Sequence, residues 1–302
     1  MAKRRGPPTV GTTAALTAAV PSSAPRADRR LIGADGSART LLLTVLGELV
    51  FPNDDAVWTS ALLYVLAGVG VEERSARQAI SRAAAAGWIT GERSGREVRW
   101  RLTPAGRRLI ADGIKRVYSL AKEPPRWCGE WLVVQVSVPQ HQRLVRKRLY
   151  AALSWAGFGN PTPGVWMSPY HERDVEAKQI IDDLDLKDST LAYVGSSTSA
   201  GLSDQEIVRR SWDLDEVAKR YEQVLIKYSG LEPQPGDPIL FTDIQLVGEW
   251  QRMPFLDPQL PEELLPDWIG RRAASVCKGL RARWRDKAHQ RWREVVEETS
   301  PG

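Results

Sequence analysis

One short segment, residues 73–86, constrains the fold of this chain most strongly because it carries two opposite faces at helical spacing. Its apolar stripe consists of Ala76, Ala79, Ile80 and Ala83, and small side chains let such a helix pack closely against its neighbours. The opposite stripe is polar and basic, with Arg74, Arg77, Gln78, Ser81 and Arg82. At 1.5 Å per residue the helix is about 20 Å long, which suits a DNA major groove. A solvated, charged helix face is the alternative interpretation.

The segments on either side favour the DNA-binding interpretation. Two helices are expected before residue 73. The first has Ser37 as its N-cap, the second has Thr59, and Gly68 and Gly70 form the turn that follows. Gly87 ends the helix at residues 73–86. Two strands, Trp88–Thr90 and Val98–Leu102, then enclose a basic loop at residues 91–97, and Thr103-Pro104 begins a further helix. This order predicts a winged helix-turn-helix domain over residues 36–120. The residues expected to contact DNA are Arg74, Ser75, Arg77, Gln78, Ser81, Arg82, Arg93, Arg96 and Arg99.

The charge distribution agrees with a polyanionic partner. The 302 residues carry a formal net charge of +5. Residues 36–120 hold twelve Lys and Arg against eight Asp and Glu, and residues 1–35 hold six against two. The segment 1–35 lacks apolar periodicity and is expected to be a disordered basic tail. A secretory signal peptide is the competing interpretation, although Thr, Pro and Ser interrupt its mildly apolar stretch.

Several stretches resemble the PaaX-type transcriptional repressors. In the N-terminal part these are "SARTLLLTVLGELV", "VEERSARQAISRAAAAGWIT" and "RLTPAG", and further on "GEWLVVQVSVP" and "DPQLPEELLPDWIG". The resemblance covers roughly residues 37–290. It implies a cytoplasmic bacterial repressor of aromatic-acid catabolism, released from double-stranded DNA by an aryl-CoA thioester such as phenylacetyl-CoA. Winged-helix repressors usually act as dimers, so a homodimer is expected.

The central segment, residues 121–204, is predicted to be a ferredoxin-like α/β sandwich. Its expected strands are Trp131–Val138, Val165–Met167 and Leu191–Val194, with helices at residues 141–157 and 172–184. In the family this segment resembles Cas2, a small fold that includes metal-dependent nucleases with an Asp near the end of the first strand. The matching position here is Ser137, which argues against the alternative function of a nucleic-acid-processing enzyme.

The C-terminal segment, residues 205–302, is predicted to be helical. Helices are expected at residues 214–228 and 237–251, and a long helix follows a Pro-rich stretch and runs to about residue 298. The apolar stripe of the long helix has two interpretations, packing within the chain or a seam between two copies. Its residues are Ala273, Cys277, Leu280, Trp284, Ala288, Trp292 and Val295.

An effector site is expected in the central and C-terminal parts. The densest basic run is Arg143-Leu144-Val145-Arg146-Lys147-Arg148, in which Arg143, Arg146 and Arg148 are candidates for phosphate groups. Trp166 and Trp212, together with Trp250, are candidates for an aryl or adenine pocket. A solvated helix face for the arginines and core packing for the tryptophans are the competing interpretations.

No catalytic, cofactor or metal motif is found in the sequence. The two cysteines and three histidines lie too far apart for most zinc-site spacings, and no phosphate loop or G-x-S-x-G elbow is present. His171, beside Glu172 and Asp174, is interpreted as a surface histidine at a helix start. The uncharged, mostly apolar stretch Ala56–Val71 is too short for a bilayer. The chain is therefore expected to be neither an enzyme nor a membrane protein. An architectural DNA-binding protein without an effector remains a third alternative.

Overall fold

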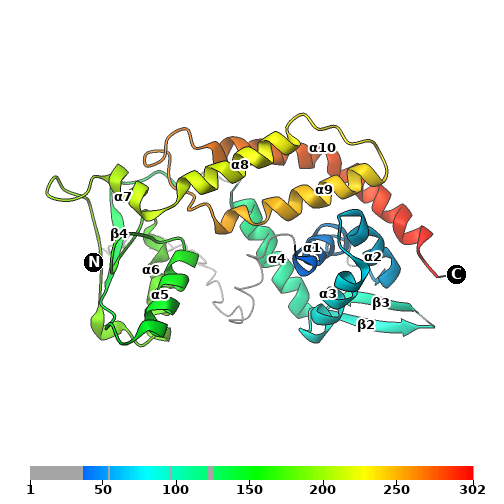
Figure 1. The fold of residues 1–302 in the computed structure, drawn as a ribbon, viewed down its shortest axis with the longest axis horizontal. Coiled ribbons are helices and arrows are strands. Elements are labelled where there is room, and N and C mark those ends of the chain that lie inside the picture. The colour runs from blue at the N-terminus through cyan, green and yellow to red at the C-terminus, as the bar shows by residue number, and fades with distance from the viewer. Residues whose placement is uncertain (1–36, 54, 96, 121–124, 302) are drawn as a thin grey trace, which may run out of the picture. The chain divides into compact units, whose positions relative to one another are not determined.

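The computed structural model describes residues 37–53, 55–95, 97–120 and 125–301 (Figure 1). The predicted tail at residues 1–35 and Arg96 therefore lie outside the described residues. The first helix, α1 (Ala38–Val45), begins at Ser37, whose hydroxyl accepts from the Thr40 amide, and it continues as the π-helical η2 (Leu46–Val50). The apolar residues that recur at helical spacing here are buried: Leu42, Val45, Leu46 and Leu49.

Two further helices complete the N-terminal helical part. α2 (Thr59–Gly68) and α3 (Glu73–Ala85) are joined by a turn in which Gly70 has φ +87°. The prediction that Thr59 caps α2 is wrong. Its hydroxyl instead donates to the Val98 carbonyl and accepts from the Trp100 indole, so it ties α2 to a neighbouring strand.

A three-stranded antiparallel sheet accompanies these helices. Its strands are β1 (Val57–Trp58), β2 (Ile89–Ser94) and β3 (Glu97–Leu102), in the order β1-β3-β2. The two long strands pair as far as Ser94 and Glu97, so residues 91–94 and 97 belong to the strands and not to the predicted loop of residues 91–97. Gly95 has φ +61° at this turn, a conformation that tight hairpins require. The two residues of β1 are too few to give a periodic signal in the sequence.

The helix α4 (Pro104–Ser119) follows the hairpin, and its cap is the predicted one. The Thr103 hydroxyl accepts from the Gly106 amide at 3.0 Å. Gly106 lies so close to the Trp88 carbonyl that a Cβ there would come within 2.0 Å of the oxygen. A residue with a side chain at position 106 would therefore push α4 away from the start of β2.

The central part is a four-stranded antiparallel sheet with the order β5-β6-β4-β7. Its elements are β4 (Trp131–Val136), α5 (Arg143–Trp155), β5 (Gly159–Thr162), β6 (Val165–Ser168), η3 (His171–Arg173), α6 (Asp174–Asp183), η4 (Lys187–Ser189) and β7 (Thr190–Gly195). This is the βαββαβ order of a ferredoxin-like sandwich. The prediction lacked β5, whose sequence Gly-Asn-Pro-Thr has no apolar alternation.

The two faces of this sheet are covered differently. Leu149 and Leu153 of α5 and Ile181 of α6 pack against one face. The helix α7 (Asp204–Ser211) and the Pro-rich segment, through Leu260 and Leu264, cover the other. Leu144, within the basic run, is 75% exposed because it lies on the outer side of α5.

The C-terminal part contains α8 (Leu214–Tyr228), α9 (Asp237–Trp250), η5 (Met253–Phe255) and α10 (Ile269–Glu298). The bounds of α8 and α9 and the end of α10 agree with the prediction to within a residue, whereas η5 was not predicted. The predicted α10 stripe is buried along its whole length, and Cys277, Leu280 and Trp284 pack in one core with Tyr221 of α8 and Trp250 of α9. A dimer seam along this stripe is therefore wrong, because those side chains already face the chain's own helices. No helix among the described residues is long and apolar enough to cross a membrane.

Candidate DNA interface

The outer face of α3 consists of Arg74, Ser75, Arg77, Gln78, Ser81 and Arg82, and every one of these residues is exposed. The predicted inner stripe is buried, with Ala76, Ala79, Ile80 and Ala83 at most 3% exposed. α3 contacts α1 and α2 through this stripe. The expected two-faced pattern is confirmed: the small side chains are buried, and the polar and basic side chains are exposed. Contact between this exposed face and DNA stays a prediction.

An ion pair modifies the outer face of α3. The Glu73 carboxylate accepts from Arg77 Nε at 2.8 Å, one helical turn away, and both side chains are more than half exposed. This pair orients the Arg77 guanidinium along the helix, and it also places a negative charge among the donors. An exposed pair of this kind is worth about 0.2–1 kcal/mol, so a phosphate or base edge can displace the carboxylate.

The β2–β3 hairpin lies beside α3 (Figure 1), and the register divides its arginines between two faces. Arg99 lies opposite Glu92, and Arg101 opposite Thr90, on one face. Arg93 pairs with Val98 and so belongs to the other face, near the turn. Arg99 and Arg93 were both expected to contact DNA, but they cannot contact the same groove surface in the same way. Arg101, exposed on the Arg99 face, was missing from that expectation.

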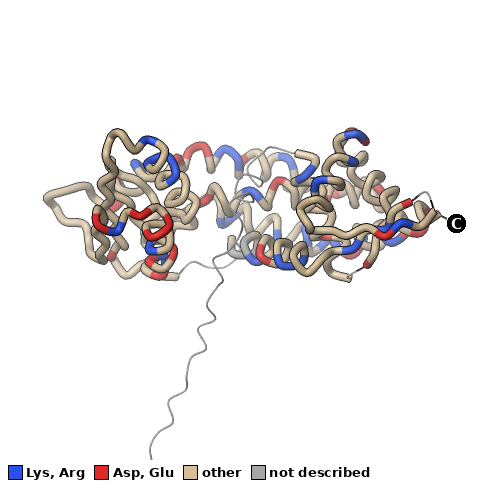
Figure 2. Tube along the Cα trace, turned by 90° about the horizontal axis from the view of Figure 1, so that it is seen from below, with Lys and Arg blue, Asp and Glu red and all other residues tan. Residues whose placement is uncertain are grey.

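The basic groups outside this region do not form one continuous sector in the part of the chain that the structure describes. Figure 2 shows Lys and Arg interspersed with Asp and Glu along the described chain. Much of α10 is basic as well. However, Arg281 and Arg291 of this helix form ion pairs within the chain, with Glu48 and Asp237. A DNA-binding surface on this chain therefore depends on particular exposed residues and their geometry, rather than on a single basic half.

The predicted effector residues do not converge on one site. Arg143 and Arg148 are exposed on α5, whereas the Arg146 guanidinium donates to the Val138 carbonyl at 2.8 Å. Trp166 is only 1% exposed and packs in the core, edge-to-face with Tyr150. Trp212 is half-buried beside Gly159, and Trp250 is 5% exposed in the core of the C-terminal helices. For Trp166 and Trp250 the structure favours core packing.

The described residues at the end of β4 do not offer the groups that the nuclease alternative requires. Ser137 directly follows β4, and its amide donates to the Ser189 carbonyl at 3.0 Å. Within the described ranges, no group of three His, Cys, Asp or Glu side chains lies close together at this end of β4. Two-metal hydrolysis needs carboxylates there to hold the ions.

Buried polar contacts connect the N-terminal helices with α9 and α10. Glu48 of η2 pairs with Arg281 of α10, and both side chains are nearly buried. The Gln251 amide, just after α9, donates to the Thr44 hydroxyl of α1 at 2.7 Å. Sequence patterns give no signal for these pairs because the partners are about 200 residues apart.

A second polar cluster lies at the same junction. The Tyr64 hydroxyl of α2 donates to Asp237 at 2.6 Å, and Arg291 of α10 pairs with the same carboxylate at 2.8 Å. The bond to Asp237 raises the pKa of Tyr64. These contacts give a rigid connection between the helices that carry α3 and the C-terminal helices.

Asp243 of α9 is the least compensated charge in this junction. It is 1% exposed, and among the residues that the structure describes its Oδ1 has no hydrogen-bond partner. Burial, with a further contribution from Glu48, raises the pKa of Asp243 to about 7, while Arg281 and Arg285 act in the opposite direction. The carboxyl is therefore partly protonated near neutral pH.

Comparisons with known proteins cover most of the chain. Three family models match: PaaX-like protein over residues 37–106, the PaaX protein central Cas2-like domain over residues 124–208, and the PaaX-like protein C-terminal domain over residues 212–294. The transcriptional repressor PaaX of Escherichia coli strain K12 is 27% identical over 255 residues, which are 80% of this chain and 78% of that protein. A solved structure of the uncharacterized protein Rv0674 from Mycobacterium tuberculosis is similar in fold. Its TM-score is 0.55 at 22% identity, covering 87% of this chain and 98% of the other.

Proposed function

The chain belongs to the family of PaaX-like proteins, and we propose on that basis that it is a DNA-binding transcriptional repressor and not an enzyme. The observation that carries the proposal is the two-faced α3, which buries its alanines and exposes six polar and basic residues. We assign residues 36–120 to a winged helix-turn-helix domain, residues 121–204 to a Cas2-like domain and residues 205–302 to a C-terminal helical domain. In this assignment α3 enters the major groove and the β2–β3 hairpin is the wing.

The proposed effector is an aryl-CoA thioester, of which phenylacetyl-CoA is the first candidate. A ligand releases a repressor only if it binds the free form more tightly than the DNA-bound form. A 100-fold loss of operator affinity requires a difference of about 2.7 kcal/mol. Arg143 and Arg148, both exposed, are the remaining candidates for the CoA phosphates.

The junction of α1 and η2 with α9 and α10 gives the effector a physical route to the DNA-binding part. A shift of α10 would break the Glu48–Arg281 pair, which is nearly buried and therefore costly to separate. An effector that moves α9 or α10 would thus also move the helices on which α3 packs. The Glu48→Gln variant tests this route: it should lower the factor by which the effector weakens operator binding.

The direct test has two stages. Sequencing of the DNA bound genome-wide should give an operator and its target genes. The protein–operator complex is then titrated with phenylacetyl-CoA, with related acyl-CoAs and with the matching free acids. Release by a CoA thioester and not by its free acid supports the proposal. If only a free acid shifts the affinity, the effector assignment fails while DNA binding stands. If no operator is found, the repressor assignment fails.

A further inference from the structure

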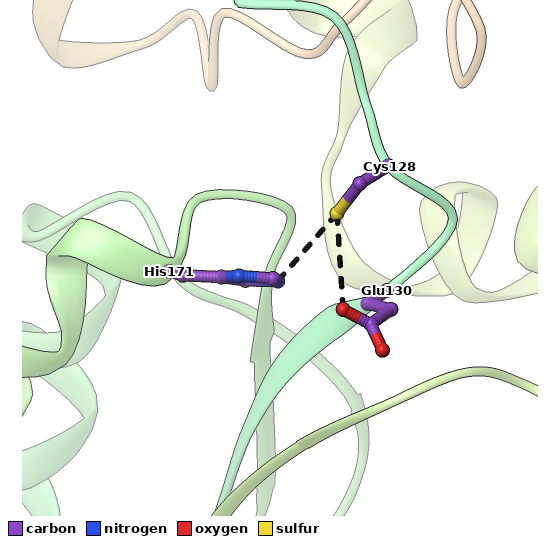
Figure 3. Close-up of side chains that lie close together, drawn as sticks. All are labelled: Cys128, Glu130 and His171. Carbon is purple, nitrogen blue, oxygen red and sulfur yellow. Dashed lines mark hydrogen bonds between the residues drawn. The ribbon is translucent and has the colours of Figure 1, made fainter.

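Three side chains of types that can bind metal ions lie close together at the edge of the central part, away from the proposed DNA interface. Cys128 and Glu130 directly precede β4, and His171 opens η3 after β6 (Figure 3). Cys128 Sγ lies 3.9 Å from His171 Nε2 and 4.0 Å from Glu130 Oε2. The three ligand atoms all lie within 4.8 Å of one another.

The sheet register explains why residues 43 positions apart meet. β4 and β6 are antiparallel neighbours in which Leu132 lies opposite Ser168. The residues before β4 therefore reach the residues after β6. Gly129 has φ +86° and turns the chain between Cys128 and Glu130. Sequence spacing excluded only local zinc motifs, so it gave no information on a site assembled by strand pairing.

We propose that Cys128, Glu130 and His171 bind a divalent transition-metal ion, with Zn²⁺ as the first candidate. In tetrahedral coordination, metal–ligand bonds of about 2.0–2.3 Å place a thiolate sulfur about 3.5 Å from a nitrogen or oxygen ligand. The two separations from Cys128 Sγ, 3.9 and 4.0 Å, exceed this by only about 0.5 Å, which side-chain rotation can close. A thiolate, an imidazole and a carboxylate suit Zn²⁺ and Co²⁺, and they do not suit Mg²⁺ or Ca²⁺. Three protein ligands leave a fourth position for water or another small ligand.

The backbone at this site is fixed by neighbouring contacts. The Trp127 indole donates to the Glu130 carbonyl at 2.7 Å and stacks edge-to-face on Trp131. On the other side, the Tyr170 amide donates to the Ser168 hydroxyl at 3.1 Å, and the Tyr170 hydroxyl donates to the Gln259 carbonyl. The three side chains therefore extend from two segments whose backbones are held in place. Binding of a metal ion then has to order only the side chains. The exposed Cys128 and Glu130 leave the site open to ions from solvent.

A bound ion would join the segment that enters β4 to the segment that leaves β6. The residues that precede Cys128 lead back to α4 and the N-terminal helices. The ion would therefore fix the point at which the chain enters the central sheet. This role is separate from DNA recognition by α3, and a failure of either proposal leaves the other intact.

The test uses the full chain, purified without a polyhistidine tag and stripped with a chelator. We expect one equivalent of Co²⁺ to give the near-ultraviolet band of a thiolate–cobalt bond and the visible bands of tetrahedral Co²⁺. Zn²⁺ should abolish both by displacement. Cys128→Ser should remove the thiolate band, and His171→Asn and Glu130→Gln should each weaken binding at least tenfold.

His141→Asn is the matched control, because it removes another exposed histidine that lies outside the group. It should bind Co²⁺ like the unmodified chain. Zn²⁺ should also raise the melting temperature of the unmodified chain and of His141→Asn, and leave that of Cys128→Ser unchanged. The proposal is overturned if no thiolate band appears, if the band survives in Cys128→Ser, or if His141→Asn loses as much affinity as His171→Asn.

Discussion

Replacing Arg77 tests whether the outer face of α3 determines which DNA sequence is bound. A bidentate contact from arginine to a guanine is worth about 1–3 kcal/mol of discrimination against the wrong base. In the free protein Arg77 is paired with Glu73 at 2.8 Å, and an exposed pair of this kind is worth about 0.2–1 kcal/mol. This ion pair must break when Arg77 contacts DNA. The net loss expected for Arg77→Ala is therefore about 1–2 kcal/mol, or about 5- to 30-fold in operator affinity.

The same geometry predicts the opposite effect for Glu73→Gln. Without the carboxylate, Arg77 enters the complex unpaired, so the affinity for DNA should rise by about 1.5- to 5-fold. Glu72→Gln is the matched control, since it removes the same charge one residue earlier, at the N-cap of α3. Glu73→Gln should raise the affinity for DNA more than Glu72→Gln does. This difference should disappear in the Arg77→Ala background. A double-mutant cycle measures this coupling directly.

Fluorescence anisotropy with the operator and a scrambled duplex, at several salt concentrations, provides the readout. Arg77→Ala should weaken the operator more than the scrambled duplex. Arg108→Ala, an exposed arginine on α4 outside the proposed interface, should have a smaller effect on both. The assignment of α3 as the sequence-reading helix would be refuted if Arg77→Ala lowered the affinity for both duplexes equally. It would also be refuted if Arg108→Ala lowered the affinity for the operator as much as Arg77→Ala does.

Three further predictions concern the wing, the oligomer and the helix junction. Arg93→Ala should weaken all duplexes evenly and reduce the slope of log affinity against log salt by up to about one unit, as for one lost phosphate contact. A homodimer should bind half-sites about 34 Å, or a multiple of it, apart, and sedimentation showing one monomer on one undivided site would contradict this. The folded-state pKa of Asp243, about 7, lies above its unfolded value, so its protonation stabilises the fold at low pH and this contribution is lost as pH rises from about 4 to 7. Asp243→Asn should therefore raise the free energy of unfolding at pH 8, by up to about 4 kcal/mol, and change it little at pH 4; urea denaturation showing the same difference at both pH values would contradict the reasoning.

The elements with a full period of apolar residues were predictable from the sequence. The stripe in α3 was visible because four small or apolar side chains recur at helical spacing, and its exposed face follows from the same periodicity. α10 was equally clear, since its stripe recurs over 30 residues. The environment of that stripe was not predictable. A row of apolar side chains looks the same whether it packs against the chain's own α8 and α9 or against a second copy.

Contacts between residues that are far apart in the sequence could not be predicted from the sequence. The Glu48–Arg281 pair joins residues 233 positions apart, and a charged residue predicts exposure until its partner is known. The three residues proposed to bind a metal ion also gave no signal in the sequence. Cys128 and His171 have no motif spacing, and only the antiparallel register of β4 and β6 brings them within 3.9 Å. Periodicity thus locates the main part of the proposed DNA interface, because that part lies on one helix. The groups that would transmit or modulate binding lie where separate segments cross, and the fold must be known before they can be named.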